Sequence, residues 1–189
     1  VASLDVLAHE DGRLSEAAPG RIIGEIADAI RRERPDVVVT FAADGAYGHP
    51  DHVAISQFAL AGIVAAAGAS AARPAHVVRK AYVLAWPADV WAAYQAAFTT
   101  LVSRVDGVER RATPWPDWAI TTTIDTRACW PTVWRAVQCH DSQIGAYAVL
   151  RTLAPDDHAA LWGRQRSYRV FSTVSGGRAR ETDLFEGLR

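Results

Sequence analysis

Residues 37–41 constrain the fold most, because they read Val-Val-Val-Thr-Phe between two stretches of helical character. An unbroken β-branched run bounded by turn residues is typical of a strand buried on both faces of a parallel sheet. In residues 19–34, apolar side chains recur at helical spacing opposite a charged face, and residues 50–67 also read as a helix. A strand between two helices predicts a layered α/β fold.

The rest of the chain continues this alternation. Further strands are expected in residues 1–7, 77–86, 119–123 and 169–173, further helices in 87–105 and 131–140, and an irregular segment in 106–118. Strand and helix in alternation favour a Rossmann-like layered fold with a mostly parallel sheet flanked by helices. With 189 residues, the chain is expected to form a single α/β domain.

Charge and composition exclude several function classes. The 20 basic and 21 acidic residues nearly cancel, so nothing directs the chain to nucleic acid or to an anionic membrane. The longest apolar stretch, residues 58–67, is too short to cross a bilayer. Cys129 and Cys139 have no Cys-x-x-Cys spacing. They fit a reducing cytosol better than a disulfide scaffold, and we therefore expect a cytoplasmic protein.

Residues 44–52, Asp-Gly-Ala-Tyr-Gly-His-Pro-Asp-His, concentrate groups that carry chemistry. They follow the best strand and precede a helix, at the place where open α/β sheets bind ligands. His49 and His52 are three residues apart and can point to one side as the helix begins. Gly45 and Gly48 allow the backbone to turn sharply and to approach a ligand.

This cluster has two interpretations. Neutral imidazole is a common zinc ligand, and a catalytic zinc activates water and polarises a carbonyl oxygen. A second histidine beside a carboxylate could stabilise an oxyanion or protonate a leaving group, and Tyr47 could donate a further hydrogen bond. In the other interpretation, a histidine near a helix start is a cap or a surface residue, and the glycines are ordinary loop residues. The residues alone favour neither.

The chain resembles the PIG-L/LmbE family of zinc-dependent N-deacetylases and amidases, which typically act on N-acetylglucosaminyl conjugates. The specific match is Gly48-His49-Pro50-Asp51-His52, preceded by Tyr47. Weaker matches to family elements are Asp11-Gly12-Arg13-Leu14, Cys139-His140-Asp141-Ser142-Gln143 and Glu181-Thr182-Asp183-Leu184-Phe185. The resemblance implies an LmbE-like deacetylase fold and Zn²⁺ or another divalent metal as cofactor.

The resemblance also implies roles for single residues. His52 matches a metal ligand, and His49 matches the histidine that stabilises the tetrahedral intermediate or acts as acid. Asp51 would orient or tune His49, and Tyr47 would help to polarise the carbonyl. His140 is assigned substrate contact, with a helix-end histidine bound to a backbone carbonyl as the equal alternative. Asp44 is also assigned to substrate binding.

One family element has no match. An Ala-His-Pro-Asp-Asp-Glu loop normally supplies two zinc ligands and the general base, and residues 8–12 resemble it only superficially. His9 and Asp11 are therefore poor candidates for metal ligands. The chain also contains no methionine and opens at Val1. We therefore expect an N-terminal strand and helix to be missing, supplied by another chain or by a part of the protein outside these residues, and the chain alone to be inactive.

The resemblance and the unmatched family element leave three candidate functions. The first is removal of an N-acetyl group from a glucosamine-type conjugate by metal-activated water. The second is an amidase that cleaves a larger acyl group in thiol-conjugate or antibiotic metabolism, and the third is a non-catalytic binding domain, with homo-oligomers possible in each case.

A pocket wall that stacks on sugars could be formed by Trp86, Trp91, Trp115 and Trp118, although packing of large aromatic side chains explains these residues better. Arg110 and Arg111 are expected to be a solvated surface pair.

Overall fold

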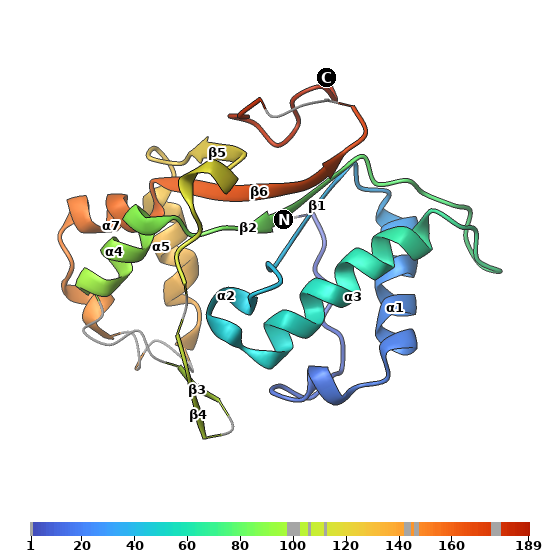
Figure 1. The fold of residues 1–189 in the computed structure, drawn as a ribbon, viewed down its shortest axis with the longest axis horizontal. Helices are drawn as coiled ribbons and strands as arrows, with labels where there is room; N and C mark the ends of the chain where they lie inside the picture. Colours follow the sequence, from blue (N-terminus) through green and yellow to red (C-terminus); the bar gives the residue numbers. More distant parts are fainter. Residues whose placement is uncertain are drawn as a thin grey trace.

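A four-stranded sheet lies at the centre of the structure, a computed structural model that describes residues 2–97, 103–105, 107–111, 113–141, 145, 148–174 and 179–189. Its strands run in the order β1-β2-β6-β5, so the last strand along the chain lies inside the sheet (Figure 1). The strands are β1 (Val37–Thr40), β2 (Lys80–Leu84), β5 (Thr122–Asp125) and β6 (Arg164–Ser172).

The sheet is mixed, and the expectation of a mostly parallel sheet is wrong. Only β1 and β2 pair in parallel, with Val37 opposite Lys80. Strand β6 runs antiparallel to both β2 and β5. Side chains alternate between the two faces in strands of either direction, so strand direction depends on which neighbour a strand meets in space. The parallel pair belongs to a β1–α3–β2 unit, and the Rossmann-like interpretation of the fold is not confirmed.

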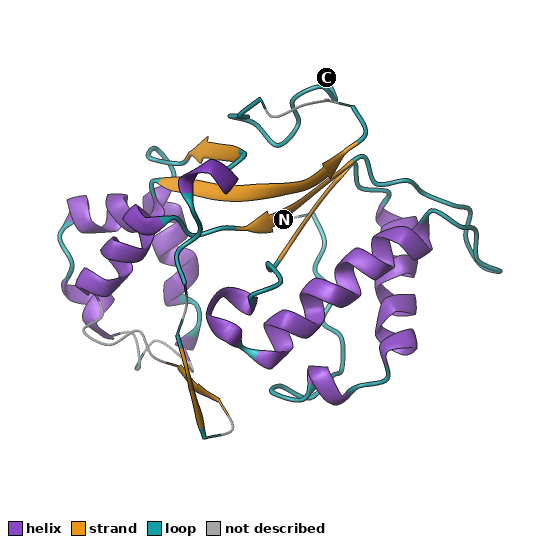
Figure 2. Cartoon of the chain, viewed as in Figure 1, coloured by secondary structure: helices purple, strands orange, loops and turns teal. Residues whose placement is uncertain are grey.

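Two long helices, α1 (Pro19–Glu33) and α3 (Pro50–Ala66), cover one face of the sheet, as Figure 2 shows. Both were predicted from the helical spacing. Their apolar residues meet Ala81 of β2 in a buried cluster. Gly62 allows the two helices to approach closely, because a Cβ atom there would lie 2.6 Å from Cγ2 of Ile26. This packing holds α3 against α1, and the first turn of α3 carries His52.

A second group of helices lies at the other end of the molecule (Figure 1). It contains α4 (Ala88–Ala97), α5 (Trp130–Gln138) and α7 (Pro155–Trp162) around their own buried apolar cluster. The shorter elements are η1 (Leu14–Glu16), α2 (Gly45–Gly48), η2 (Asp117–Ala119), η3 (Ala148–Thr152) and the hairpin of β3 (Ser103–Val105) and β4 (Val108–Arg110). Among the described residues, no helix is long and apolar enough to cross a membrane.

Three further expectations need correction. The described part of residues 1–7 forms no strand, and its apolar side chains Leu4 and Val6 are 82% and 85% exposed, because no described strand pairs with this segment. Strand β1 is not buried on both faces, because the side chain of Val39 is 45% exposed. It also lies at the edge of the described sheet. Of the helix expected in residues 87–105, α4 accounts for Ala88–Ala97, residues 98–102 lie outside the described residues, and Ser103–Val105 is a strand.

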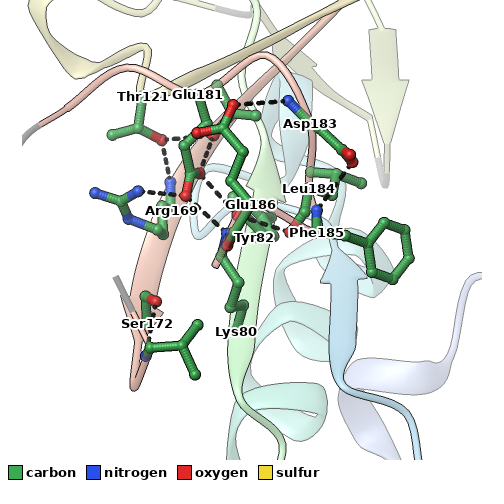
Figure 3. A network of polar contacts seen from close by, with 12 residues as sticks. Lys80, Tyr82, Thr121, Arg169, Ser172, Glu181, Asp183, Leu184, Phe185 and Glu186 are labelled. Atoms are coloured by element: carbon green, nitrogen blue, oxygen red, sulfur yellow. Dashed lines mark hydrogen bonds and ion pairs between the residues drawn. The ribbon is translucent and has the colours of Figure 1, made fainter. Parts of the chain in front are cut away.

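Glu181 joins the C-terminal segment to the sheet face opposite α1 and α3. Its carboxylate is 2.7 Å from Nζ of Lys80 and 2.6 Å from Nη1 of Arg169. It also accepts hydrogen bonds from the hydroxyls of Tyr82 and Thr122, at 2.8 and 2.9 Å, as Figure 3 shows for Tyr82 and Arg169. Glu181 is only 3% exposed, so the carboxylate has exchanged water for these four partners.

Burial of the Glu181 carboxyl raises its pKa, but the hydrogen bonds from Lys80, Tyr82, Thr122 and Arg169 outweigh burial and lower the pKa from 4.5 to about 2. A carboxyl whose pKa is lower in the folded protein stabilises the fold above the unfolded pKa. The stabilisation from Glu181 is therefore complete above about pH 4.5 and is lost as the pH falls toward 2.

We predict that Glu181→Gln lowers the free energy of unfolding by about 3–5 kcal/mol at neutral pH, because it leaves buried cations without their counter-charge. Urea unfolding monitored by tryptophan fluorescence measures this. The exposed pair Glu109–Arg111 supplies the control, since Glu109→Gln should change stability by less than about 1 kcal/mol. Equal effects of the two substitutions, or an unchanged acid transition in Glu181→Gln, would contradict the role of Glu181.

Ala46 is held in a strained backbone conformation within α2. Its φ of 66° and ψ of −52° lie in a region that residues with a side chain rarely adopt. Ala46 follows Gly45, whose φ is also positive at 61°. The two residues together reverse the chain between β1 and α3.

We predict that Ala46→Gly raises the free energy of unfolding by about 1 kcal/mol, because glycine adopts this conformation without the steric strain. Ala92→Gly is the matched control, since Ala92 is an exposed residue in the middle of α4. It should lower stability by about 0.5–1 kcal/mol. Thermal and urea unfolding of both variants measure this, and a loss of stability in Ala46→Gly would show that Ala46 is not strained.

Candidate functional site

The turn after β1 brings the predicted site residues together. Gly45 and Gly48 have φ angles of 61° and 77°, which confirms that these glycines allow a sharp turn. A side chain at Gly45 would also collide with α3, because its Cβ atom would lie 2.8 Å from Cγ2 of Val53. Asp44 begins α2 by accepting a hydrogen bond from the amide of Ala46 at 3.0 Å. The chain then enters α3 at Pro50, the first helical residue as predicted.

Four aromatic rings form a cluster at this turn. The His52 ring stacks on Phe41 with a centroid distance of 4.0 Å and on His49 at 4.7 Å. Tyr47 presents an edge-on contact to both histidines, at 5.9 Å from His49 and 5.4 Å from His52. The structure therefore brings Tyr47, His49 and His52 together. We refer to Phe41, Tyr47, His49 and His52 as the ring cluster.

His52 has the properties of a metal-binding histidine. Its Nδ1 lies 3.2 Å from the carbonyl oxygen of Gly45. A carbonyl only accepts, so Nδ1 carries the proton and Nε2 keeps its lone pair. Burial lowers the pKa of His52 below 6.5, with repulsion from His49 adding to it, although the Gly45 hydrogen bond acts in the other direction. The ring is therefore neutral at neutral pH, the form in which imidazole binds a metal ion.

His49 has the opposite tautomer. It is the N-cap of α3, and its Nδ1 accepts a hydrogen bond from the amide of Asp51 at 3.2 Å. The proton of the neutral ring therefore lies on Nε2, which makes that atom a hydrogen-bond donor. The interpretation of a histidine near the helix start as a cap is confirmed for His49. Capping does not use Nε2, so the residue remains able to donate to a ligand.

Asp51 anchors a distant loop to the cluster. Its carboxylate accepts hydrogen bonds from the amides of Gly12 and Leu14, at 2.7 and 2.9 Å. The stretch Asp11-Gly12-Arg13-Leu14, which resembled a family element, is therefore attached to the first turn of α3. The observed contact between Asp51 and His49 uses the Asp51 amide. The assignment of Asp51 as the residue that tunes His49 stays a prediction.

Asp44 connects α2 to an apolar pocket. Its carboxylate accepts a hydrogen bond from the indole nitrogen of Trp115 at 2.8 Å. Trp115, Trp86 and Trp91 line the pocket, and Trp118 lies outside it with 81% of its surface exposed. The other lining residues are Phe41, Ala42, Asp44, Ala46, Leu84 and Thr113. Phe41 also stacks on His52, so the pocket adjoins the ring cluster.

Two other histidines lie apart from the cluster. His140 is exposed just beyond α5, and its backbone amide donates to the carbonyl of Val137 at 3.1 Å. No contact joins its side chain to the ring cluster within the described ranges, so substrate contact by His140 stays a prediction. Ser142 and Gln143, from the same family element, lie outside the described residues. His9 is bound to Glu25 through Nε2 at 2.8 Å.

A zinc ion requires more ligands than this part of the protein shows. Over the residues that the structure describes, no three histidine, cysteine, aspartate or glutamate side chains come close enough to hold a metal ion. His52 suits one coordination position because its Nε2 is free of the proton. The ligand set of a zinc site is therefore not complete here.

Sequence reasoning missed several residues of the site. Phe41 was identified only as the end of a strand, although an aromatic residue at the carboxyl end of a strand next to a histidine pair was a usable signal. The amides of Gly12 and Leu14 carry no side-chain signal. Arg110 was expected to be solvated, but it is half-buried against Gly48.

Known proteins are similar to this chain over most of its length. The family model described as GlcNAc-PI de-N-acetylase matches residues 1–63, which include the ring cluster. A protein of Kineococcus radiotolerans is 32% identical over 93% of this chain and 52% of its own length. Proteins of Thermobifida fusca and Acidothermus cellulolyticus are each 30% identical, over 85% and 86% of this chain and 58% and 55% of their own lengths.

All three relatives are named 1D-myo-inositol 2-acetamido-2-deoxy-alpha-D-glucopyranoside deacetylase. The chain spans about half the length of each of them, with coverage of 52%, 58% and 55%. The family model covers the residues from Tyr47 to His52, and the relatives are similar across most of the chain. The chain belongs to the PIG-L/LmbE family of GlcNAc-PI de-N-acetylases.

Proposed function

We propose that the protein containing this chain hydrolyses the N-acetyl group of a glucosamine-type conjugate. The observation that carries the proposal is the pair of complementary tautomers in the ring cluster. His52 presents a lone pair at Nε2, and His49 presents a proton at Nε2. The names of the relatives support an acetamido sugar linked to inositol as the substrate class.

Hydrolysis of an amide places two demands on this site. Attack of water on the carbonyl carbon creates an oxyanion, and the departing nitrogen needs a proton before the C–N bond breaks to release an amine and acetate. His49 can donate from Nε2 to the oxyanion or to the nitrogen. Tyr47 lies edge-on to both histidines and can add a second donor through its hydroxyl.

A divalent metal, zinc by family resemblance, would supply activated water and polarise the carbonyl oxygen when bound. We propose that His52 is one of its ligands. The other ligands and the general base would come from a part of the protein outside this chain, so the chain alone would be inactive. Cys129 and Cys139 are free thiols, which supports a cytoplasmic location as part of the proposal.

One observation favours a second candidate function, an amidase for a longer acyl group. The pocket beside the ring cluster is lined mainly by apolar and aromatic side chains, and the carboxylate of Asp44, one of its few polar groups, already binds Trp115. An acetyl group does not need such a surface. A longer acyl chain would bury apolar area against Trp86, Trp91 and Trp115.

We predict that His52→Ala removes both the bound metal and the activity of the full protein. His49→Ala should keep the metal and lower kcat by about 100-fold or more, because it removes only the donor. Elemental analysis and acetate release from N-acetylglucosamine conjugates measure the two effects. His76→Ala is the control, since His76 binds the carbonyl of Pro35 and lies outside the cluster. Unchanged metal content in His52→Ala would reject the ligand assignment, and a full protein that binds no metal would favour a non-catalytic binding domain.

A second prediction separates the two candidate functions. If the pocket takes an acyl chain, N-hexanoylglucosamine conjugates are hydrolysed at least as efficiently as N-acetyl ones. Thr113→Trp should then lower kcat/KM for the hexanoyl substrate by about 10-fold or more relative to the acetyl substrate, because it fills the pocket. Trp118→Ala, outside the pocket, should leave the ratio unchanged. Release of acetate alone would reject the longer-acyl amidase.

A further inference from the structure

Arg110 lies directly against the loop of the ring cluster. It is the last residue of β4, and its side chain covers Gly48, the residue before His49. A Cβ atom at Gly48 would lie 3.5 Å from Cδ and 3.8 Å from Nη1 of Arg110. Thr113 and Trp115, a few positions later in the sequence, line the pocket with Asp44 and Ala46. The guanidinium group of Arg110 is thus held where the hairpin meets the site.

The guanidinium group of Arg110 is not satisfied by the part of the protein that is described. Its Nε is shielded from solvent and has no hydrogen-bond partner there. No described acidic residue forms an ion pair with it. The neighbouring Arg111 behaves differently, since its side chain is 70% exposed and is paired with Glu109 at 2.7 Å. The expected solvated pair is therefore correct for Arg111 and wrong for Arg110.

Three other half-buried arginines are paired with acidic side chains. The side chains of Arg31, Arg166 and Arg169 are 9%, 12% and 8% exposed and contact Asp28, Asp89 and Glu181, respectively. A guanidinium is always charged, and leaving one of its donors buried without an acceptor is unfavourable. An acceptor from a ligand would remove that penalty.

We propose that Arg110 binds an anionic oxygen group, a carboxylate or a phosphate, on the molecule that occupies the ring-cluster site. The planar donor fork of arginine matches both groups. The identification of this molecule as a substrate rests on the proposed function. The substrate class is then an N-acylated amino sugar that carries a negative charge away from the amide. Since Arg110 binds the charged group equally before and during the reaction, it lowers KM and leaves kcat unaffected.

The kinetic test compares three acetamido sugars with the full protein: the neutral methyl glycoside of N-acetylglucosamine, N-acetylglucosamine 1-phosphate and N-acetylmuramic acid, which carries a carboxylate. We expect one of the two charged substrates to have the higher kcat/KM, and whichever it is identifies the anion. Arg110→Ala should reduce that preference by about 10- to 100-fold, mainly through KM. Arg110→Lys should recover only part of it, and Arg111→Ala should retain it.

A binding test separates this proposal from the proposed reaction. Inorganic phosphate and acetate are titrated into wild-type protein, Arg110→Ala and Arg111→Ala, with calorimetry as the readout and circular dichroism to verify folding. Anion binding that is lost only in Arg110→Ala supports the anion site even if no preparation releases acetate. Equal binding and equal substrate preference in all three proteins would overturn it, as would equal losses in both variants.

Discussion

The buried carboxylate of Glu181 is the interaction on which the sheet arrangement depends. A charge with 3% exposure is tolerated only when every oxygen has a partner, and the partners of Glu181 come from β2, β5 and β6. These strands are far apart in sequence. One acidic residue from the C-terminal segment therefore holds together a sheet whose order, β1-β2-β6-β5, does not follow the chain.

The site depends on the opposite face of that sheet. Close packing at Gly62 holds α3 against α1, and the strained turn at Gly45 and Ala46 connects β1 to the first turn of α3. Two histidines with opposite tautomers then meet in one ring cluster. Their difference does not come from the ring itself. It comes from the backbone group that each Nδ1 faces, a carbonyl at His52 and an amide at His49.

The sequence predicted much of this arrangement from local patterns. The approximate bounds of α1, β1 and α3, the sharp turn at the glycines and the meeting of Tyr47, His49 and His52 follow from local patterns within residues 19–66. The reversed direction of β6 could not be predicted, because side-chain alternation is the same for either direction. The absence of a strand in the described part of residues 1–7 could not be predicted either, because a strand needs a neighbour with which to pair. The exposure of Val39 depends equally on what covers β1.

The sequence by itself determined the chemical groups of the site and the family to which they point, because they are adjacent along the chain and their spacing on a helix start is fixed by local geometry. Only the tertiary structure decided that Asp51 holds the Gly12–Leu14 amides, that Phe41 stacks on His52, that Asp44 binds Trp115 and that Arg110 covers Gly48. Asp44 and Trp115 are 71 positions apart. Contacts over such separations arise from packing of the sheet and helices, and no local pattern encodes them.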